Sequence, residues 1–162
     1  MAPQTYSKTQ IALHWIIALL VLFQIVVHDE IVRLWAGRID GTLPNAPAPA
    51  PNAHVAIGIL ILALVVWRLV LRLTRGVPAL PADEHPALKL VASGTHILFY
   101  VLLIGMPLSG AAAWILGVTT AAQAHSIAEK LLILLIALHL LAALTQHFWF
   151  RTDALKRMLG RA

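Results

Sequence analysis

Four long apolar runs limit what this chain can fold into. They span residues 10–27, 54–73, 95–116 and 127–150. Each has about the 17–25 residues that a helix needs to cross the hydrocarbon core of a bilayer. Leu, Ile, Val and Ala fill the runs without the strict alternation of a barrel strand, which favours helices. The predicted fold is therefore all-α, an integral membrane bundle of four helices in which residues 1–162 form a single domain.

Composition disfavours several other classes of protein. Hydrophobic residues make up 60% of the chain and charged residues only 12%, whereas soluble domains carry about 25% charged residues. This argues against a soluble enzyme, a disordered chain and an ordinary nucleic-acid-binding module. The net charge of +5 comes from basic residues that flank apolar runs. The absence of cysteine excludes disulfides, iron–sulfur clusters, thiolate zinc sites and c-type haem attachment.

The sequences between the runs predict connections of different character. Residues 29–53 contain a Pro- and Ala-rich tract and are expected to form an irregular loop outside the membrane. Residues 75–93 hold several Gly and Pro residues and are expected to form a second loop. Residues 117–124 are few and uncharged, which predicts a tight link between the third and fourth spans.

The basic residues indicate how the bundle is oriented. All Lys and Arg residues except Arg33, Arg38 and Lys130 fall on the side that also holds both termini. Because basic residues concentrate on the cytoplasmic side of membrane proteins, both termini are predicted to be cytoplasmic. One Lys precedes the first run and no clear cleavage site follows Val27, so this run is interpreted as an uncleaved anchor.

Histidine is the unusual residue of this chain. Six of the eight histidines lie in or at the edges of the predicted spans: His14, His54, His96, His125, His139 and His147. Ionisable side chains are costly inside a membrane and are usually functional there. Acidic partners are almost absent from the spans, so haem ligation by neutral imidazole is more natural than a carboxylate proton relay. His28 and His85 are interpreted as ordinary polar residues.

The spacing of the histidines predicts haem ligands at two levels. His125 and His139 are 14 residues apart, which on a helix is about 21 Å and nearly four turns. They therefore point in similar directions at two depths. His54 begins its span at the depth of His125, and His14 lies near the inner surface. These four histidines are the predicted axial ligands, but depth alone leaves open whether His139 pairs with His14 or with His96 or His147.

Other residues near the histidines can serve either a haem or the bundle itself. Small residues lie close to the histidines at Gly58, Gly105, Ser109 and Gly110. They give room for a macrocycle or for ordinary close packing of helices. Pro107 predicts a kink in the third span. Arg68 and Arg72 are placed to pair with haem propionates, or they simply flank their span as inner positive charges.

The ordered combination of these segments resembles the prokaryotic cytochrome b561 family, small four-helix dihaem cytochromes linked to quinone. The resemblance covers nearly the whole chain and rests on residues 6–15, 54–58, 67–73, 94–96, 125, 137–144 and 147–151. It implies two b-type haems, with His14 and His139 as ligands on the inner side and His54 and His125 on the outer side. One departure is Gln146, because some members carry a histidine pair where this chain has Gln146 and His147.

The resemblance also implies a function, that of a superoxide oxidase in the bacterial inner membrane. Superoxide would be oxidised to O₂ at the periplasmic side, and ubiquinone would be reduced at the inner side. Lys130 is the preferred residue for steering the superoxide anion, because it follows His125 by about one and a half turns. His147 and Gln146, together with Arg68, are candidates to hold or protonate the quinone.

Two further classes of function are compatible with the sequence. The chain could be a cytochrome b subunit that relays electrons between a dehydrogenase or hydrogenase partner and quinone. It could also be a haem-free transporter or metal-handling protein that uses the histidines as ligands. The absence of cysteine and the near absence of intramembrane carboxylates count against this last class.

Overall fold

The computed structural model describes residues 5–42, 52–79 and 86–161, and every element in these ranges is a helix. The helices are α1 (Lys8–Val26), α2 (Asp29–Ile39), α3 (Ala53–Arg75), α4 (Pro86–Leu116), α5 (Thr119–Phe148) and α6 (Ala154–Met158). Four of them, α1, α3, α4 and α5, are long and apolar enough to cross a membrane. The prediction of an all-α membrane bundle with four spans is confirmed.

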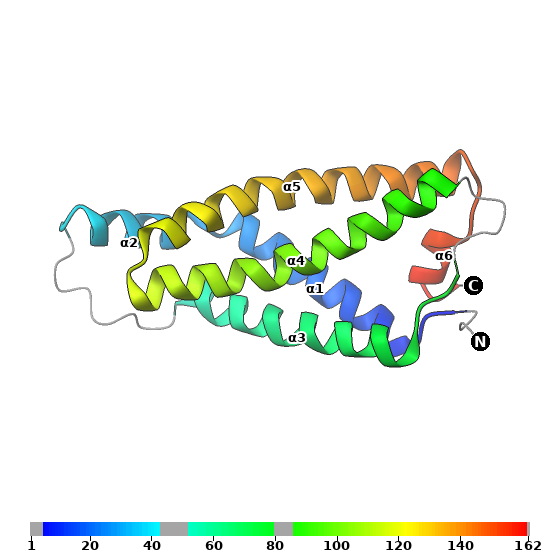
Figure 1. The fold of residues 1–162 in the computed structure, drawn as a ribbon, viewed down its shortest axis with the longest axis horizontal. Coiled ribbons are helices and arrows are strands. Elements are labelled where there is room, and N and C mark those ends of the chain that lie inside the picture. The colour runs from blue at the N-terminus through cyan, green and yellow to red at the C-terminus, as the bar shows by residue number, and fades with distance from the viewer. Residues whose placement is uncertain (1–4, 43–51, 80–85, 162) are drawn as a thin grey trace.

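The four long helices lie along one axis, and the chain reverses between them (Figure 1). Helix α3 packs against α1 and α4, and α4 packs against α5, whereas the backbones of α1 and α5 make no comparable contact. Both termini and α6 lie at one end of the bundle, which we call the terminal end. Helix α2 and the connection between α4 and α5 lie at the other end, the α2 end.

Local sequence signals fix the starts of the first two spans. Ser7 caps α1 by accepting a hydrogen bond from the Gln10 backbone N–H, and the Gln10 side chain accepts one from the Ser7 backbone N–H. Asn52 caps α3 in the same way by accepting from the Val55 backbone N–H. Gly76 ends α3 with a φ of 73°, a left-handed conformation that glycine adopts without strain.

The core of the bundle lies between its two ends. Apolar side chains from all four spans form it: Leu13, Ile17, Val21, Ile61, Val65, Leu71, Leu102, Leu132 and Leu135. On α1 the three members recur every four residues, which places them on one face of the helix. Val65 is the most buried of the set, with 1% of its surface exposed. Most other apolar side chains of the spans face outward, as a lipid-facing surface requires.

The structure corrects the three predicted connections. Residues 29–39 form α2 rather than an irregular loop, with Asp29 and Glu30 in its first turn and Arg38 in its last, where they complement the helix dipole. The Pro-rich tract of residues 43–51 and His85 lie outside the described residues. The prolines in the second half of residues 29–53 led to the prediction of a loop for the whole segment. Its first part is instead a charged helix.

The third and fourth spans also begin earlier than predicted. Helix α4 starts at Pro86, nine residues before the predicted start, because proline is well suited to the first position of a helix. Helix α5 starts at Thr119, so only Gly117 and Val118 separate α4 from α5. The predicted link over residues 117–124 was therefore too long. Because α5 begins this early, His125 and His139 lie on one continuous helix.

The C-terminal tail folds back on the terminal end of the bundle. The Trp15 indole Nε1–H donates to the backbone oxygen of Met158 at 2.8 Å, which joins α1 to the end of α6. Arg157 donates from Nη1 to the backbone oxygen of Ala79 at 3.1 Å. The tail, which the sequence marked only as basic, thus covers the end of the bundle nearest to His14.

Candidate functional site: two pairs of facing histidines

The first pair of histidines joins α1 to α5 toward the terminal end. The imidazole rings of His14 and His139 have centroids 6.5 Å apart and an interplanar angle of 60°. Both side chains are half-buried. Since the backbones of α1 and α5 make fewer close contacts than the other neighbouring spans, these side chains bridge the two helices.

The second pair joins α3 to α5 toward the α2 end. The rings of His54 and His125 have centroids 6.2 Å apart and an interplanar angle of 63°. His54 lies in the first turn of α3 and His125 in the second turn of α5. The four histidines predicted from the sequence therefore form two pairs, and α5 contributes one member to each.

The ring separations fit a single metal atom between each pair of imidazoles. A metal held in line between two imidazoles, about 2 Å from each nitrogen, puts the ring centres about 6.4 Å apart. A direct hydrogen bond between two rings would bring the centres to about 5.2 Å. The observed 6.5 and 6.2 Å match the metal-bridged value. Each pair therefore fits the axial ligation of a haem iron.

Helix α4 sets the orientation of His125. Its Nδ1 lies 2.8 Å from the backbone oxygen of Met106 and 3.4 Å from the hydroxyl of Ser109. A carbonyl oxygen can only accept, so Nδ1 carries the proton and Nε2 keeps the lone pair that a metal requires. Gly110 makes this position possible, because a Cβ there would lie 3.1 Å from the imidazole ring of His125.

His54 is held by its backbone rather than by its ring. The Gln24 side-chain amide donates to the His54 backbone oxygen at 2.7 Å, which fastens α1 to the start of α3. Gly58, one turn later, faces the same Gln24 amide, 3.7 Å from where its Cβ would lie. The Nδ1 atom of His54 has no hydrogen-bond partner among the described residues. The two members of this pair thus differ in how their rings are fixed.

A basic recess lies near the first pair, at the terminal end. It is small and partly open to solvent, and it is lined by Tyr6, Gln10, Arg68, Arg72, Val77 and Tyr100. Arg68 donates from Nη1 to the Gln10 backbone oxygen, and the guanidinium of Arg72 lies 6.0 Å from the centre of the Tyr100 ring. Within the part of the chain that the structure describes, the lining contains two guanidinium groups and no carboxylate, so the recess suits a carboxylate group of a ligand.

The residues predicted to bind quinone lie together at the end of α5, away from both pairs. His147 is half-buried, rests edge-on against Phe148 with ring centroids 4.8 Å apart, and has no hydrogen-bond partner at Nδ1 among the described residues. The Gln146 side-chain oxygen accepts from the Thr152 hydroxyl at 3.0 Å, and its backbone oxygen accepts from the Thr152 N–H at 2.9 Å. Gln146 therefore also holds the turn that follows α5.

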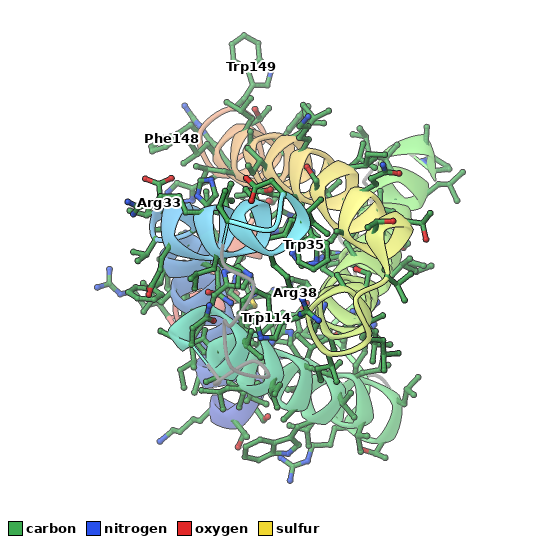
Figure 2. The ribbon with its side chains drawn as sticks, turned by 90° about the vertical axis from the view of Figure 1, so that its left-hand side faces the viewer. Arg33, Trp35, Arg38, Trp114, Phe148 and Trp149 are labelled. Carbon is green, nitrogen blue, oxygen red and sulfur yellow. The ribbon has the colours of Figure 1, made fainter. Side chains whose placement is uncertain are left out.

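The α2 end, opposite the termini, carries the remaining basic residues, namely Arg33, Arg38 and Lys130. Figure 2 views this end, with Trp35, Arg38 and Trp114 toward the middle and Arg33 on the outer side of α2. Arg38 donates from Nη1 to the Trp114 backbone oxygen at 2.5 Å, which holds α2 over the end of α4. Lys130 is exposed on α5, about 140° around the helix from His125. The sequence singled out Lys130 and gave Arg38 no structural role.

The structure places His96 beside the first pair. Depth alone had left the partner of His139 undecided. Ring contacts join His139 to His14 and also to His96 of α4, but not to His147, among the residues that the structure describes. The open choice among three partners is thereby narrowed to two. Phe99, one turn after His96, also packs edge-on against His139 with centroids 5.2 Å apart.

Four membrane-length helices that bring imidazoles together in facing pairs define a class, the helical membrane cytochromes of b type. The profile of the prokaryotic cytochrome b561 family matches residues 5–161, so the chain belongs to that family. The resemblance seen in the sequence is confirmed. Membership makes the protein a multi-pass membrane cytochrome that binds b-type haem and transfers electrons.

Individual relatives are similar along nearly their whole length. Cytochrome b562 of Cereibacter sphaeroides is 33% identical over 159 residues, covering 95% of this chain and 94% of the relative. The probable superoxide oxidase CybB of Yersinia pestis is 28% identical over 179 residues, covering 96% of each protein. Cytochrome b561 homolog 2 of Escherichia coli K12 is 27% identical over 182 residues, covering 99% of this chain and 94% of the relative.

Proposed function

We propose that this protein is a dihaem superoxide:ubiquinone oxidoreductase of the bacterial inner membrane, with both termini in the cytoplasm. The observation that carries the proposal is the pairing of imidazoles at two levels of α5, each pair at a separation that fits one iron atom. His14 and His139 would hold one haem b, and His54 and His125 the other. When bound, haem would supply reversible one-electron chemistry.

The protein contributes orientation and the exclusion of water. Met106 fixes the tautomer of His125, and Gln24 fixes the backbone of His54. Ile17, Val21, Ile61 and Val65 belong to the core that fills the bundle between the two levels. This apolar filling keeps water and ions out of the interval of about 21 Å that separates His125 from His139 along α5.

Arg68 and Arg72 are proposed to pair with haem propionates at the terminal end. Both guanidinium groups line a recess to which none of the described residues contributes a carboxylate. A propionate would accept hydrogen bonds from those N–H donors of Arg68 that are not already bonded to the Gln10 backbone oxygen or to Tyr100. The concentration of basic residues at this end supports its placement on the cytoplasmic side.

The α2 end is proposed to receive superoxide. Superoxide is an anion, so positive charge at this end raises its local concentration. Lys130 remains the proposed steering residue, and Arg33 and Arg38 of α2 add to its field. Asp40 opposes them, because hydrogen bonds from the backbone N–H and hydroxyl of Thr42 hold the pKa of its carboxyl below the ordinary value and keep it ionised.

The terminal end is proposed to receive ubiquinone near His147 and Gln146. Two superoxide anions would each lose one electron and leave as O₂, and one ubiquinone would take both electrons and two protons to become ubiquinol. The half-buried imidazole of His147, with Nδ1 unpartnered among the described residues, is the proposed group for proton delivery to the quinone oxygen. Gln146, tied to Thr152, would position that end of α5.

A second candidate is a cytochrome b subunit that passes electrons between a dehydrogenase or hydrogenase partner and quinone. The name of the relative at 33% identity states a cytochrome and no reaction, so it fits this candidate as well as the first. Such a subunit would accept electrons from its partner and would not oxidise superoxide on its own.

Purified protein separates these functions in two measurements. A b-type α band on reduction, with about two haems per chain by extraction, is expected from paired bis-imidazole sites. Superoxide generated enzymatically should then be consumed faster with ubiquinone present, with ubiquinol as product. Haem without this activity, regained on adding a dehydrogenase, would favour the subunit. A colourless protein from haem-replete cells would refute both.

A further inference from the structure

His96, on α4, contacts the ring of His139. One ring nitrogen of His96 is already hydrogen-bonded, and the other can accept a hydrogen bond. The two rings meet edge to face with centroids 5.8 Å apart and an interplanar angle of 78°. The Nδ1 atom of His96 lies 2.7 Å from the backbone oxygen of Ala92. Since a carbonyl oxygen only accepts, Nδ1 carries the proton, and Nε2 of His96 is a free acceptor.

The ring separations assign different roles to the two neighbours of His139. The 6.5 Å separation from His14 matches a metal-bridged pair, for which about 6.4 Å is expected. The 5.8 Å separation from His96 is too short for that. It is about 0.6 Å longer than the ring separation of a linear imidazole–imidazole hydrogen bond, so such a bond requires a small rotation of one of the two side chains. The shorter separation therefore favours a hydrogen-bonding role for His96 over a role as iron ligand.

Helix α4, which carries His96, also orients His125 of α5. At the α2 end, His125 donates directly to the backbone oxygen of Met106 on α4. At the terminal end, α4 presents His96 and Phe99 on one face, and both contact His139. Helix α4 therefore offers each α5 imidazole an acceptor, a carbonyl in one case and a second imidazole in the other.

We propose that His96 is the positioning residue of His139, with Nε2 of His96 accepting a hydrogen bond from Nδ1–H of His139. The Ala92 carbonyl fixes the tautomer of His96, and His96 in turn fixes the tautomer of His139. The inference rests on the proposed role of His139 as an iron ligand. An acceptor at Nδ1 makes a ligating imidazole more basic and holds its ring in place.

Three variants of the haem-loaded protein test the proposal. His96→Leu removes the acceptor and keeps the bulk, His96→Gln keeps an acceptor near the position of Nε2, and Phe99→Leu changes packing alone. Redox titration and low-temperature electron paramagnetic resonance are the readouts. In His96→Leu the terminal-end haem should rise in midpoint potential and be retained about 10- to 100-fold less tightly, with the other haem unchanged. His96→Gln and Phe99→Leu should remain close to the unmodified protein.

Several outcomes would overturn the proposal. One is an unchanged potential and resonance spectrum in His96→Leu. Another is a high-spin terminal-end haem in both His96 variants, which would make His96 an axial ligand. If His96→Leu does not assemble, redox-induced infrared difference spectra of the unmodified protein, with ¹⁵N-labelled histidine, decide whether Nδ1–H of His139 is hydrogen-bonded or free. Absence of haem from the unmodified protein would instead refute the proposed function.

Discussion

The two histidine pairs lie on the same helix but in different surroundings. At the α2 end, backbone groups dominate: His125 bonds to the Met106 carbonyl, and His54 is held through its own carbonyl by Gln24. At the terminal end, rings and cations dominate. Trp15 packs edge-on against His14 with centroids 5.2 Å apart, and His96 and Phe99 pack against His139.

This difference gives the proposed electron path a direction. Arg68 and Arg72 lie at the terminal end, and positive charge stabilises the reduced, less positive state of a nearby iron. The α2 end has Arg38 and Arg33, but Asp29, Glu30 and Asp40 offset them on the same short helix and its C-cap. The terminal-end haem should therefore have the higher potential, which favours electron flow away from the α2 end.

Removing one ligand from each pair is the most disruptive test of this comparison. His125→Ala should lose the α2-end haem and His139→Ala the terminal-end haem, because each leaves one iron without an axial imidazole. About half of the haem should remain in each variant, and the two spectra should sum to that of the unmodified protein. Haem extraction and reduced-minus-oxidised spectra measure this. Identical spectra for the two variants would contradict the assignment of the pairs.

A smaller change aims at the α2-end pair alone. Gly110→Val places methyl groups where a Cβ would already lie 3.1 Å from the His125 ring, and such overpacking costs about 1–3 kcal/mol. The α2-end haem should be lost at a lower concentration of denaturant, or of an added apoprotein that takes up released haem. The terminal-end haem should be unaffected. Gly94→Val is the matched control on the same helix, since nothing lies within 4 Å of a Cβ there. Equal haem loss in the two variants would show that the effect comes from the helix and not from His125.

The electrostatic part of the comparison predicts the smallest shift. Arg68→Gln removes one positive charge near the terminal-end pair, and the potential of that haem should fall by an equivalent on the order of 1 kcal/mol. Arg33→Gln, on the exposed side of α2, is the control and should leave the terminal-end potential unchanged. Spectroelectrochemical titration of both haems is the measurement. A rise in potential in Arg68→Gln would reverse the proposed direction of electron flow.

The sequence predicted the parts of this architecture that depend on length and period. Apolar length marked the four spans, and the spacing of 14 residues placed His125 and His139 at two levels of one helix. The match in depth between His54 and His125 also agrees with their ring contact. These features follow from the geometry of a single helix in a membrane, so they need no knowledge of packing.

The features that the sequence did not predict depend on helix rotation and on backbone atoms. Whether His96 or His147 would reach His139 depends on how α4 and α5 rotate against one another, which period alone does not fix. The acceptor for His125 is a backbone carbonyl, which leaves no mark in the side-chain pattern. Helix α2 was missed because the prolines that follow it dominated the composition of the segment.

One consequence follows from the continuity of α5. Since His125 and His139 belong to the same uninterrupted helix, an axial shift of that helix moves both imidazoles by the same amount. A macrocycle bound at either level would hold the helix in the register that the other level needs, because a ligand stabilises the arrangement to which it binds. Binding of one cofactor should therefore favour binding of the other during biogenesis, although each pair can hold its own haem alone.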